Sequence, residues 1–324
     1  MAILTLFSRA GLIALALCGL AANPALACST CGCGLPGSAS EISSVVGPVN
    51  PYNGQFLIQT SLSLRDVTGS FNDRGTWNPK PTGSSLLTAG GGLGITYFPS
   101  DTWNVGLQVP FAANRLAGAQ WAAQGAINPL DDENGPVPPQ YGGGLSDITL
   151  QGSYVALQSE EWWPSVSLWA GLVLPTGASS GDAAGFTGGG SLSGQIGVSA
   201  FRSFGAFEAF GNLGYQGPLA NGTSATQTAF YVGQAFIGQA QVYWNLTPEW
   251  KLGLSAMTVR AWISDPSVAA TASSLGKIKL SPSVEWRFTP EHSIRVAYGA
   301  DPTIGPWLNS MTDQTLSVVY SRYF

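Results

Sequence analysis

Hydrophobic and polar residues alternate at every second position through many short segments of the 324-residue chain. The segment 276–289 is the clearest, with an apolar face of Ile278, Leu280, Val284, Trp286 and Phe288. A period of two predicts a β-strand whose two faces meet different surroundings. Twelve such strands are predicted, at residues 54–65, 86–98, 103–111, 145–157, 163–174, 190–202, 205–216, 232–246, 249–261, 276–289, 292–299 and 314–324.

Short and long connections alternate between these predicted strands. Short turns occupy residues 99–101, 159–161, 203–205, 247–249 and 289–291, whereas the longest of the other links covers residues 112–144. An even number of strands, with short turns on one side and long loops on the other, is typical of bacterial outer-membrane barrels. The pattern therefore predicts an all-β fold: a transmembrane antiparallel up-and-down β-barrel of about 12 strands, with both termini in the periplasm.

The last predicted strand ends the chain on an aromatic residue. Its apolar face carries Leu316, Val318, Tyr320 and Phe324, and Arg322 interrupts that face. This end resembles the C-terminal signal of outer-membrane barrels, so we expect the barrel-assembly machinery to bind it. Outer-membrane lipids and lipopolysaccharide are the other partners that this location implies.

Composition agrees with a barrel and excludes other classes. Charged residues are 10% of the chain, against about 25% in soluble domains. Hydrophobic residues reach 44%, yet no run after residue 27 approaches the length of a spanning helix. The net charge of −5 argues against a nucleic-acid partner.

Aromatic residues gather at the strand ends beside the short turns. They are Tyr97, Phe98, Trp103, Trp162, Trp163, Phe204, Trp244, Trp250 and Phe288. Because amphipathic rings prefer the membrane interface, this distribution predicts an aromatic girdle.

The first residues have the features of a secretory signal. Arg9 precedes a short apolar run, and Ala25-Leu26-Ala27 forms an A-x-A cleavage site. We therefore expect a signal peptide at residues 1–27, a cysteine-containing segment at 28–53 that could plug the lumen, and a barrel at 54–324. Lipid attachment at Cys28 is an alternative for this end.

Three cysteines stand close together as Cys28, Cys31 and Cys33. Three thiols at this spacing could hold a soft metal such as copper or zinc, which would be the only cofactor. In the oxidising periplasm, a local disulfide with one remaining thiol explains the same spacing. A redox pair and lipid attachment stay open as well.

If the face of Phe324 points outward, most strand charges point into the lumen. These candidates for a solute path are Arg65, Asp147, Glu208, Lys251, Lys277, Lys279, Glu285, Arg287 and Arg295. One interpretation is a basic stripe that selects anionic or polar solutes. The other is that the charges pair across the lumen and seal it.

No catalytic motif accompanies these charges. The single histidine, His292, follows a predicted short turn and is interpreted as a solvated turn residue. Neither an HExxH motif nor a phosphate-binding loop occurs in the sequence. We therefore expect a protein that is not an enzyme.

Three phrases resemble a known family: Gly144-Leu145-Ser146-Asp147-Ile148-Thr149-Leu150, Leu172-Val173-Leu174-Pro175-Thr176-Gly177 and Trp286-Arg287-Phe288-Thr289-Pro290. They resemble the outer-membrane barrels of the MetA-pathway phenol-degradation family. The resemblance implies a transporter in the outer membrane for small, hydrophobic or aromatic solutes, which diffuse through a lumen gated by loops. A metal-binding or redox-linked barrel and a closed structural or adhesive barrel are the alternatives.

Overall fold

The computed structural model describes residues 54–71, 75–80, 82–118, 137–159, 163–177, 188, 192–220, 234–262, 275–303 and 311–324. Fourteen strands form one sheet within these ranges. Their bounds are β1 (Phe56–Phe71), β2 (Trp77–Pro79), β3 (Ser85–Tyr97), β4 (Trp103–Gly118), β5 (Val137–Leu145), β6 (Ile148–Leu157), β7 (Ser165–Leu174), β8 (Leu192–Phe204), β9 (Phe207–Ala220), β10 (Gln234–Asn245), β11 (Trp250–Trp262), β12 (Leu275–Thr289), β13 (His292–Ala300) and β14 (Met311–Tyr323).

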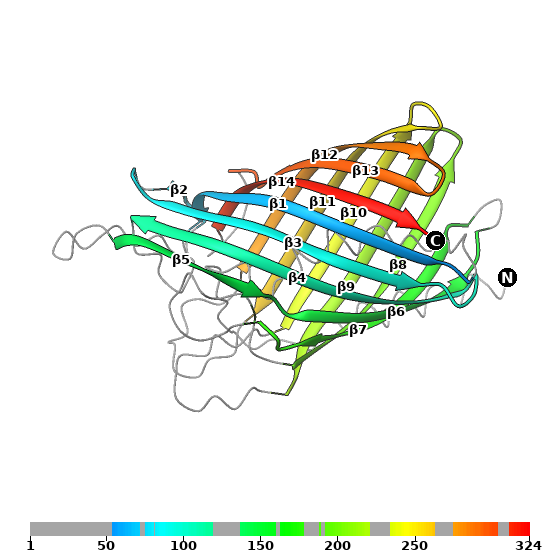
Figure 1. Cartoon of the computed structure of the whole chain (residues 1–324), viewed down its shortest axis with the longest axis horizontal. Helices are drawn as coiled ribbons and strands as arrows, with labels where there is room; N and C mark the ends of the chain where they lie inside the picture. The colour runs from blue at the N-terminus through cyan, green and yellow to red at the C-terminus, as the bar shows by residue number, and fades with distance from the viewer. Residues whose placement is uncertain are drawn as a thin grey trace.

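The sheet closes on itself because β1 pairs with both β3 and β14, antiparallel in each case (Figure 1). β5 and β6 both pair with β4, one after the other, and so share one position in the wall. The three-residue β2 pairs only with Gly69–Phe71, the last residues of β1. The result is the closed antiparallel barrel of 12 strands that the sequence predicts.

The two ends of the barrel differ as the connection lengths predict. The strand ends that short turns join lie at the end of the barrel that also holds residue 54 and the last residue, and the strand ends that long links join lie at the opposite end (Figure 1). At the short-turn end, Phe56 and Phe324 exchange backbone hydrogen bonds of 3.1 and 2.8 Å. The first and last strands are therefore joined down to their tips.

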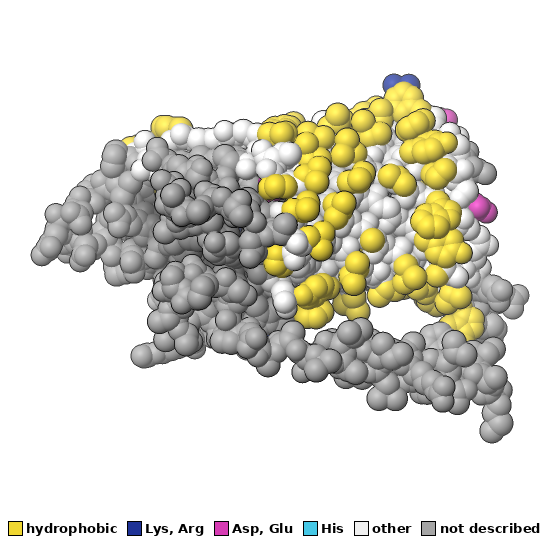
Figure 2. Space-filling view, turned by 90° about the horizontal axis from the view of Figure 1, so that it is seen from below, with side chains coloured by type: hydrophobic (Ala, Val, Ile, Leu, Met, Phe, Trp, Pro, Cys, Tyr) yellow, Lys and Arg dark blue, Asp and Glu magenta, His cyan; other side chains and the backbone are white. Residues whose placement is uncertain are grey.

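The two faces of the wall differ in polarity. On β14, Leu316 and Val318 are 48% and 39% exposed, while Thr315 and Ser317 on the other face are buried. Hydrophobic side chains spread over the outer wall in Figure 2, where charged side chains are scarce. The outer face is therefore the apolar one, and the polar positions of each strand line the lumen.

Rings pack against one another on the outer wall near the short turns. Phe56 and Tyr97 stack at 4.6 Å between ring centroids, and Trp250 and Trp286 at 5.8 Å. His292 belongs to this group, because its Nδ1 lies 2.7 Å from the Tyr320 hydroxyl oxygen. The His292 ring also lies 5.4 Å from the Phe288 ring. The expectation of a solvated turn histidine is therefore wrong, because His292 is the first residue of β13 and packs among these rings.

Two details of the predicted girdle and loops differ from the structure. Phe98 is only 3% exposed and is buried rather than on the outer surface. Much of the expected long loop 112–144 is strand, because β4 continues to Gly118 and β5 begins at Val137. Two prolines and three glycines in β5 hide its period from the sequence. Trp162 lies outside the described residues.

Candidate functional site: the barrel lumen

The buried carboxylate of Asp313 pairs with two lumen cations near the long-loop end of the barrel. Asp313 Oδ2 accepts a hydrogen bond of 2.9 Å from Arg65 Nε, and its Oδ1 accepts one of 2.5 Å from Lys279 Nζ. The Thr315 hydroxyl donates to the same carboxylate at 3.0 Å. The Asp313 side chain is fully buried, so this cluster ties β1, β12 and β14 together inside the wall.

A second cluster lies nearer the short turns. Lys251 Nζ donates to both oxygens of Glu208, at 3.0 and 2.9 Å, and the Asn245 amide donates to the same carboxylate. On the neighbouring strands, Glu285 stands opposite Arg295 in the register. Arg287 approaches Glu285 at 3.8 Å. Each acid here faces a base, and the two acids stand against three bases, so the local fields cancel in part.

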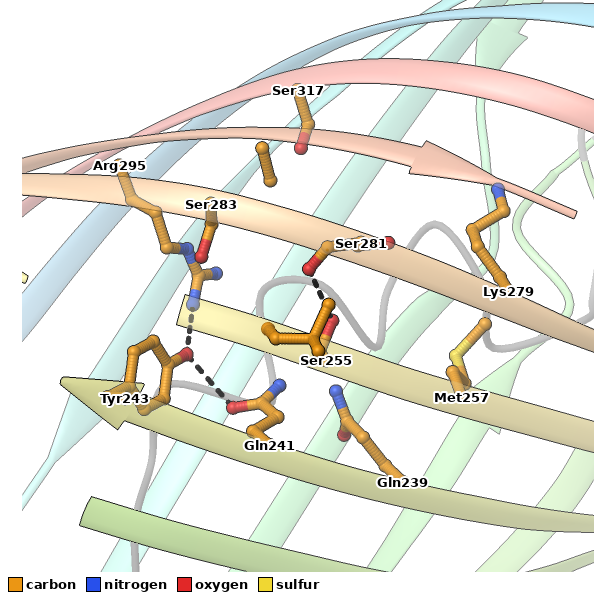
Figure 3. A pocket seen from close by; sticks show the side chains of 12 residues that line it. Gln239, Gln241, Tyr243, Ser255, Met257, Lys279, Ser281, Ser283, Arg295 and Ser317 are labelled. Carbon is orange, nitrogen blue, oxygen red and sulfur yellow. Dashed lines mark hydrogen bonds between the residues drawn. The ribbon is translucent and has the colours of Figure 1, made fainter. Parts of the chain in front are cut away.

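A cavity of about 40 Å³ lies between these two clusters, on the lumen side of β10 to β14 (Figure 3). Seven of its twelve lining residues carry a hydroxyl or amide group, and Lys279 and Arg295 lie at its two sides. Such a volume holds a few water molecules. The cavity is therefore a narrow part of the lumen with room for water.

Tyr243 sets one wall of this cavity. Its hydroxyl accepts a hydrogen bond of 3.1 Å from Arg295 and donates one of 3.0 Å to Gln241 Oε1 (Figure 3). The ring lies over Gly253, its register partner on β11, where an added Cβ would meet the ring at 2.7 Å. The tyrosine is thus fixed at both its ring and its hydroxyl.

Two of the sequence phrases meet where β5 ends and β6 begins. The Thr176 hydroxyl donates to the Ser146 carbonyl at 2.8 Å and accepts from the Ile148 amide at 2.9 Å. The buried Asp147 carboxylate accepts a hydrogen bond of 2.9 Å from the Gly177 amide. The backbone groups freed by the strand break are therefore bonded by the end of β7.

One lumen-facing ring was not singled out by the sequence. Trp169 lies on the polar face of β7, between Ser167 and Gly171, and donates a hydrogen bond of 2.8 Å from Nε1 to Asn212 Oδ1. The only signal in the sequence is that Trp169 falls at every second position with the residues of the inner face. Serine, glycine and valine share the face, and leucines occupy the other.

The remaining predicted residues divide between described and undescribed positions. Lys277 is in β12, but its side chain lies outside the described part of the structure. Cys28, Cys31 and Cys33 also lie outside it, and so does the predicted plug segment. At the chain end, the Arg322 guanidinium sits 4.1 Å from the Phe324 ring centroid, on the outer face with Leu316 and Val318.

The sequence profile of a family described as "Putative MetA-pathway of phenol degradation" matches residues 98–303. That range is more than half of the 324-residue chain. Among curated proteins, none matches the chain in sequence.

One solved structure is similar in fold, and others align with the chain more weakly. The COG4313 outer membrane channel from Pseudomonas putida F1 has a TM-score of 0.64 and 13% identity, over 86% of this chain and 98% of that one. The toluene transporter TbuX from Ralstonia pickettii has a TM-score of 0.44 and 11% identity, over 92% and 96%. The β domain of the Bordetella autotransporter BrkA has a TM-score of 0.47 and 10% identity, over 84% and 100%.

Proposed function

Because this chain belongs to the MetA-pathway phenol-degradation family, we propose that it is an outer-membrane channel for small neutral solutes, hydrophobic and aromatic ones among them. The solutes diffuse through the lumen without a covalent step. The observation that carries the proposal is the closed barrel with an apolar outside and a polar inside.

The wall supports a place in a bilayer. With no water in the hydrocarbon, every backbone group must find a partner within the protein, and a closed barrel meets that demand. Large apolar side chains such as Leu62 (60% exposed) and Leu213 (65% exposed) would be unfavourable in water and favourable against lipid. We assign the short-turn end to the periplasm, where the assembly machinery would meet the last strand, and the opposite end to lipopolysaccharide.

The lumen charges support neutral rather than ionic cargo. Asp313 lies between Arg65 and Lys279, and Glu208 is bonded to Lys251. Among the described residues each of these lumen acids lies beside a base, so the two clusters leave only a small excess of positive charge to attract ions. Of the two interpretations that the sequence leaves open, these pairings favour paired charges over a basic stripe.

The narrow cavity supports control of passage. Tyr243, Arg295 and Gln241 form a bonded group that occupies lumen volume beside it. We include the long connections in the proposal as the gate, since the strand ends that they join all lie at the same end of the barrel. Exchange of bonded partners and loop movement would open the path in steps.

Liposome swelling tests the proposal. Purified barrel in liposomes should accelerate swelling in isosmotic glycerol and arabinose, with a slower rate for the larger solute. Liposomes carrying heat-unfolded protein are the matched control. Swelling no faster than that control, for every solute, would reject a channel. Recovery of the native protein with the inner membrane would reject its proposed location.

A further inference from the structure

Trp169 is an aromatic ring held in an otherwise small and polar stretch of lumen wall. In the register, Trp169 stands opposite Gly197 on β8, and Gly197 stands opposite Gly214 on β9. Ring atoms of Trp169 lie where a side chain on either glycine would begin: a Cβ on Gly214 would meet the ring at 2.6 Å, and one on Gly197 would meet it more closely still. The indole therefore lies across the backbone of both strands.

The ring is fixed as well as supported. Its Nε1–H donates to Asn212 Oδ1 at 2.8 Å, so the polar group of the indole is already satisfied. Trp169 keeps partial exposure even though the glycine backbone covers one side of the ring. Since the residue is on the lumen face of β7, this exposed surface is available to molecules in the lumen.

Hydrogen-bonding groups flank the ring on the same wall. Gln195 Nε2 donates to Gln216 Oε1 at 2.9 Å, one inward position from each glycine toward the long loops. On the other side, Asn212 stands opposite Gln239, which lines the cavity. An apolar ring thus lies between an amide pair and the strand whose Gln239 lines the cavity.

We propose that Trp169 is a stacking site for the planar aromatic ring of a neutral solute, with the partly exposed Gln195 amide bonding its polar substituent. Aromatic rings gain from offset stacking beyond the area that they bury. A ring held in place in advance also loses little freedom on binding. The inference names a solute class for the proposed channel and rests on that function for its role, although binding itself does not require conduction.

A purely structural role is the competing explanation, because a tryptophan packed on two glycines also holds neighbouring strands together. Ligand binding distinguishes the two roles, since a purely structural Trp169 would give the barrel no affinity for an aromatic solute. The probe is 4-fluorophenol, titrated into the purified full-length barrel in detergent and followed by ¹⁹F NMR. Unlabelled phenol, cyclohexanol and methyl glucoside then compete, because they differ in planarity and in polarity.

Trp169→Ala should weaken 4-fluorophenol binding by about tenfold, since stacking and buried ring area are lost together. Trp244→Phe is the control for tryptophan removal, because Trp244 belongs to the outer girdle and is 46% exposed. Gly214→Ala should also weaken binding by displacing the ring. Its control is Gly211→Ala on the same strand, where an added Cβ meets nothing within 4 Å. Heat-modifiable migration on a gel checks that each variant is folded.

The expected result is a saturable shift for the native barrel and both controls, reduced in Trp169→Ala and Gly214→Ala, and reversed by phenol far better than by cyclohexanol. Three results would overturn the site: no saturable shift in the native barrel, equal affinity in Trp169→Ala, or equal competition by cyclohexanol or the glucoside. Conductance is measured on the same preparations. A barrel that conducts but does not bind removes the site alone, and one that binds but never conducts removes the channel.

Discussion

Asp313 on the last strand accepts a 2.9 Å hydrogen bond from Arg65 on the first strand, so a buried ion pair crosses the seam at which the barrel closes. Lys279 on β12 adds a second cation to the same carboxylate. The seam is thus held by side chains in the lumen in addition to the backbone ladder.

Removing the shared carboxylate should weaken closure. Asp313→Ala leaves Arg65 and Lys279 without their common acid, and loss of one partner of a buried pair costs about 3–5 kcal/mol. The urea midpoint of unfolding in lipid vesicles should fall accordingly. Asp66→Ala is the matched control, because its pair with Lys80 is 46% exposed on the acid side and contributes about 0–1 kcal/mol. Equal midpoints for the two variants would contradict the role of Asp313.

Shortening Tyr243 should widen the lumen. Its ring occupies space beside the cavity and is held by Arg295 and Gln241, so Tyr243→Ala removes volume from the narrow region. Single-channel conductance in a planar bilayer should rise severalfold. Trp244→Ala, the next residue but on the outer face, should leave conductance unchanged. A Tyr243→Ala conductance at or below the native value would place the constriction elsewhere.

Breaking one lumen pair should create ion selectivity. Glu208→Gln removes the carboxylate that neutralises Lys251 and leaves one extra positive charge in the lumen. The reversal potential in a KCl gradient should therefore shift toward anion permeability. Glu249→Gln, in an exposed turn, tests whether any lost acid has this effect. A shift toward cations, or the same shift in both variants, would refute the local pairing argument.

The Thr176 hydroxyl should protect the junction of β5 and β6. Thr176→Val keeps the shape of the side chain but removes both hydrogen bonds, to Ser146 and Ile148. A net loss of about 0.5–1.5 kcal/mol should speed amide exchange at Ile148 by about two- to tenfold. Thr247→Val, at the opposite end of the barrel, should not change it. Unaltered exchange at Ile148 in Thr176→Val would show that the bridge contributes nothing.

The barrel could be predicted from sequence because its two strongest signals are local. Side-chain alternation gives the strands, and turn composition gives the alternation of short and long links. The prediction missed β5, because Pro138, Pro139 and the following glycines obscure the alternation. It also started the last strand at residue 314, so Asp313 was not among the lumen charges.

Side-chain contacts between strands that are far apart in the sequence could not be predicted in this way. The sequence assigns Arg65 and Lys279 to the inner face, but Arg65 meets an acid 248 positions away. Only the closure of β1 on β14 brings them together. Trp169 was missed for the same reason, since its support comes from two glycines on other strands. Phe98 lies just beyond β3 at a buried position. Its nearness to a short turn was the sole reason for placing it in the aromatic girdle, and that placement is wrong.

Single-channel recording of the native barrel tests the central claim most directly. With purified protein added to a planar bilayer in KCl, we expect small, discrete current steps with only a weak preference for Cl⁻ over K⁺. A correctly folded barrel that inserts yet never gives a current step, while Tyr243→Ala is equally silent, would contradict it.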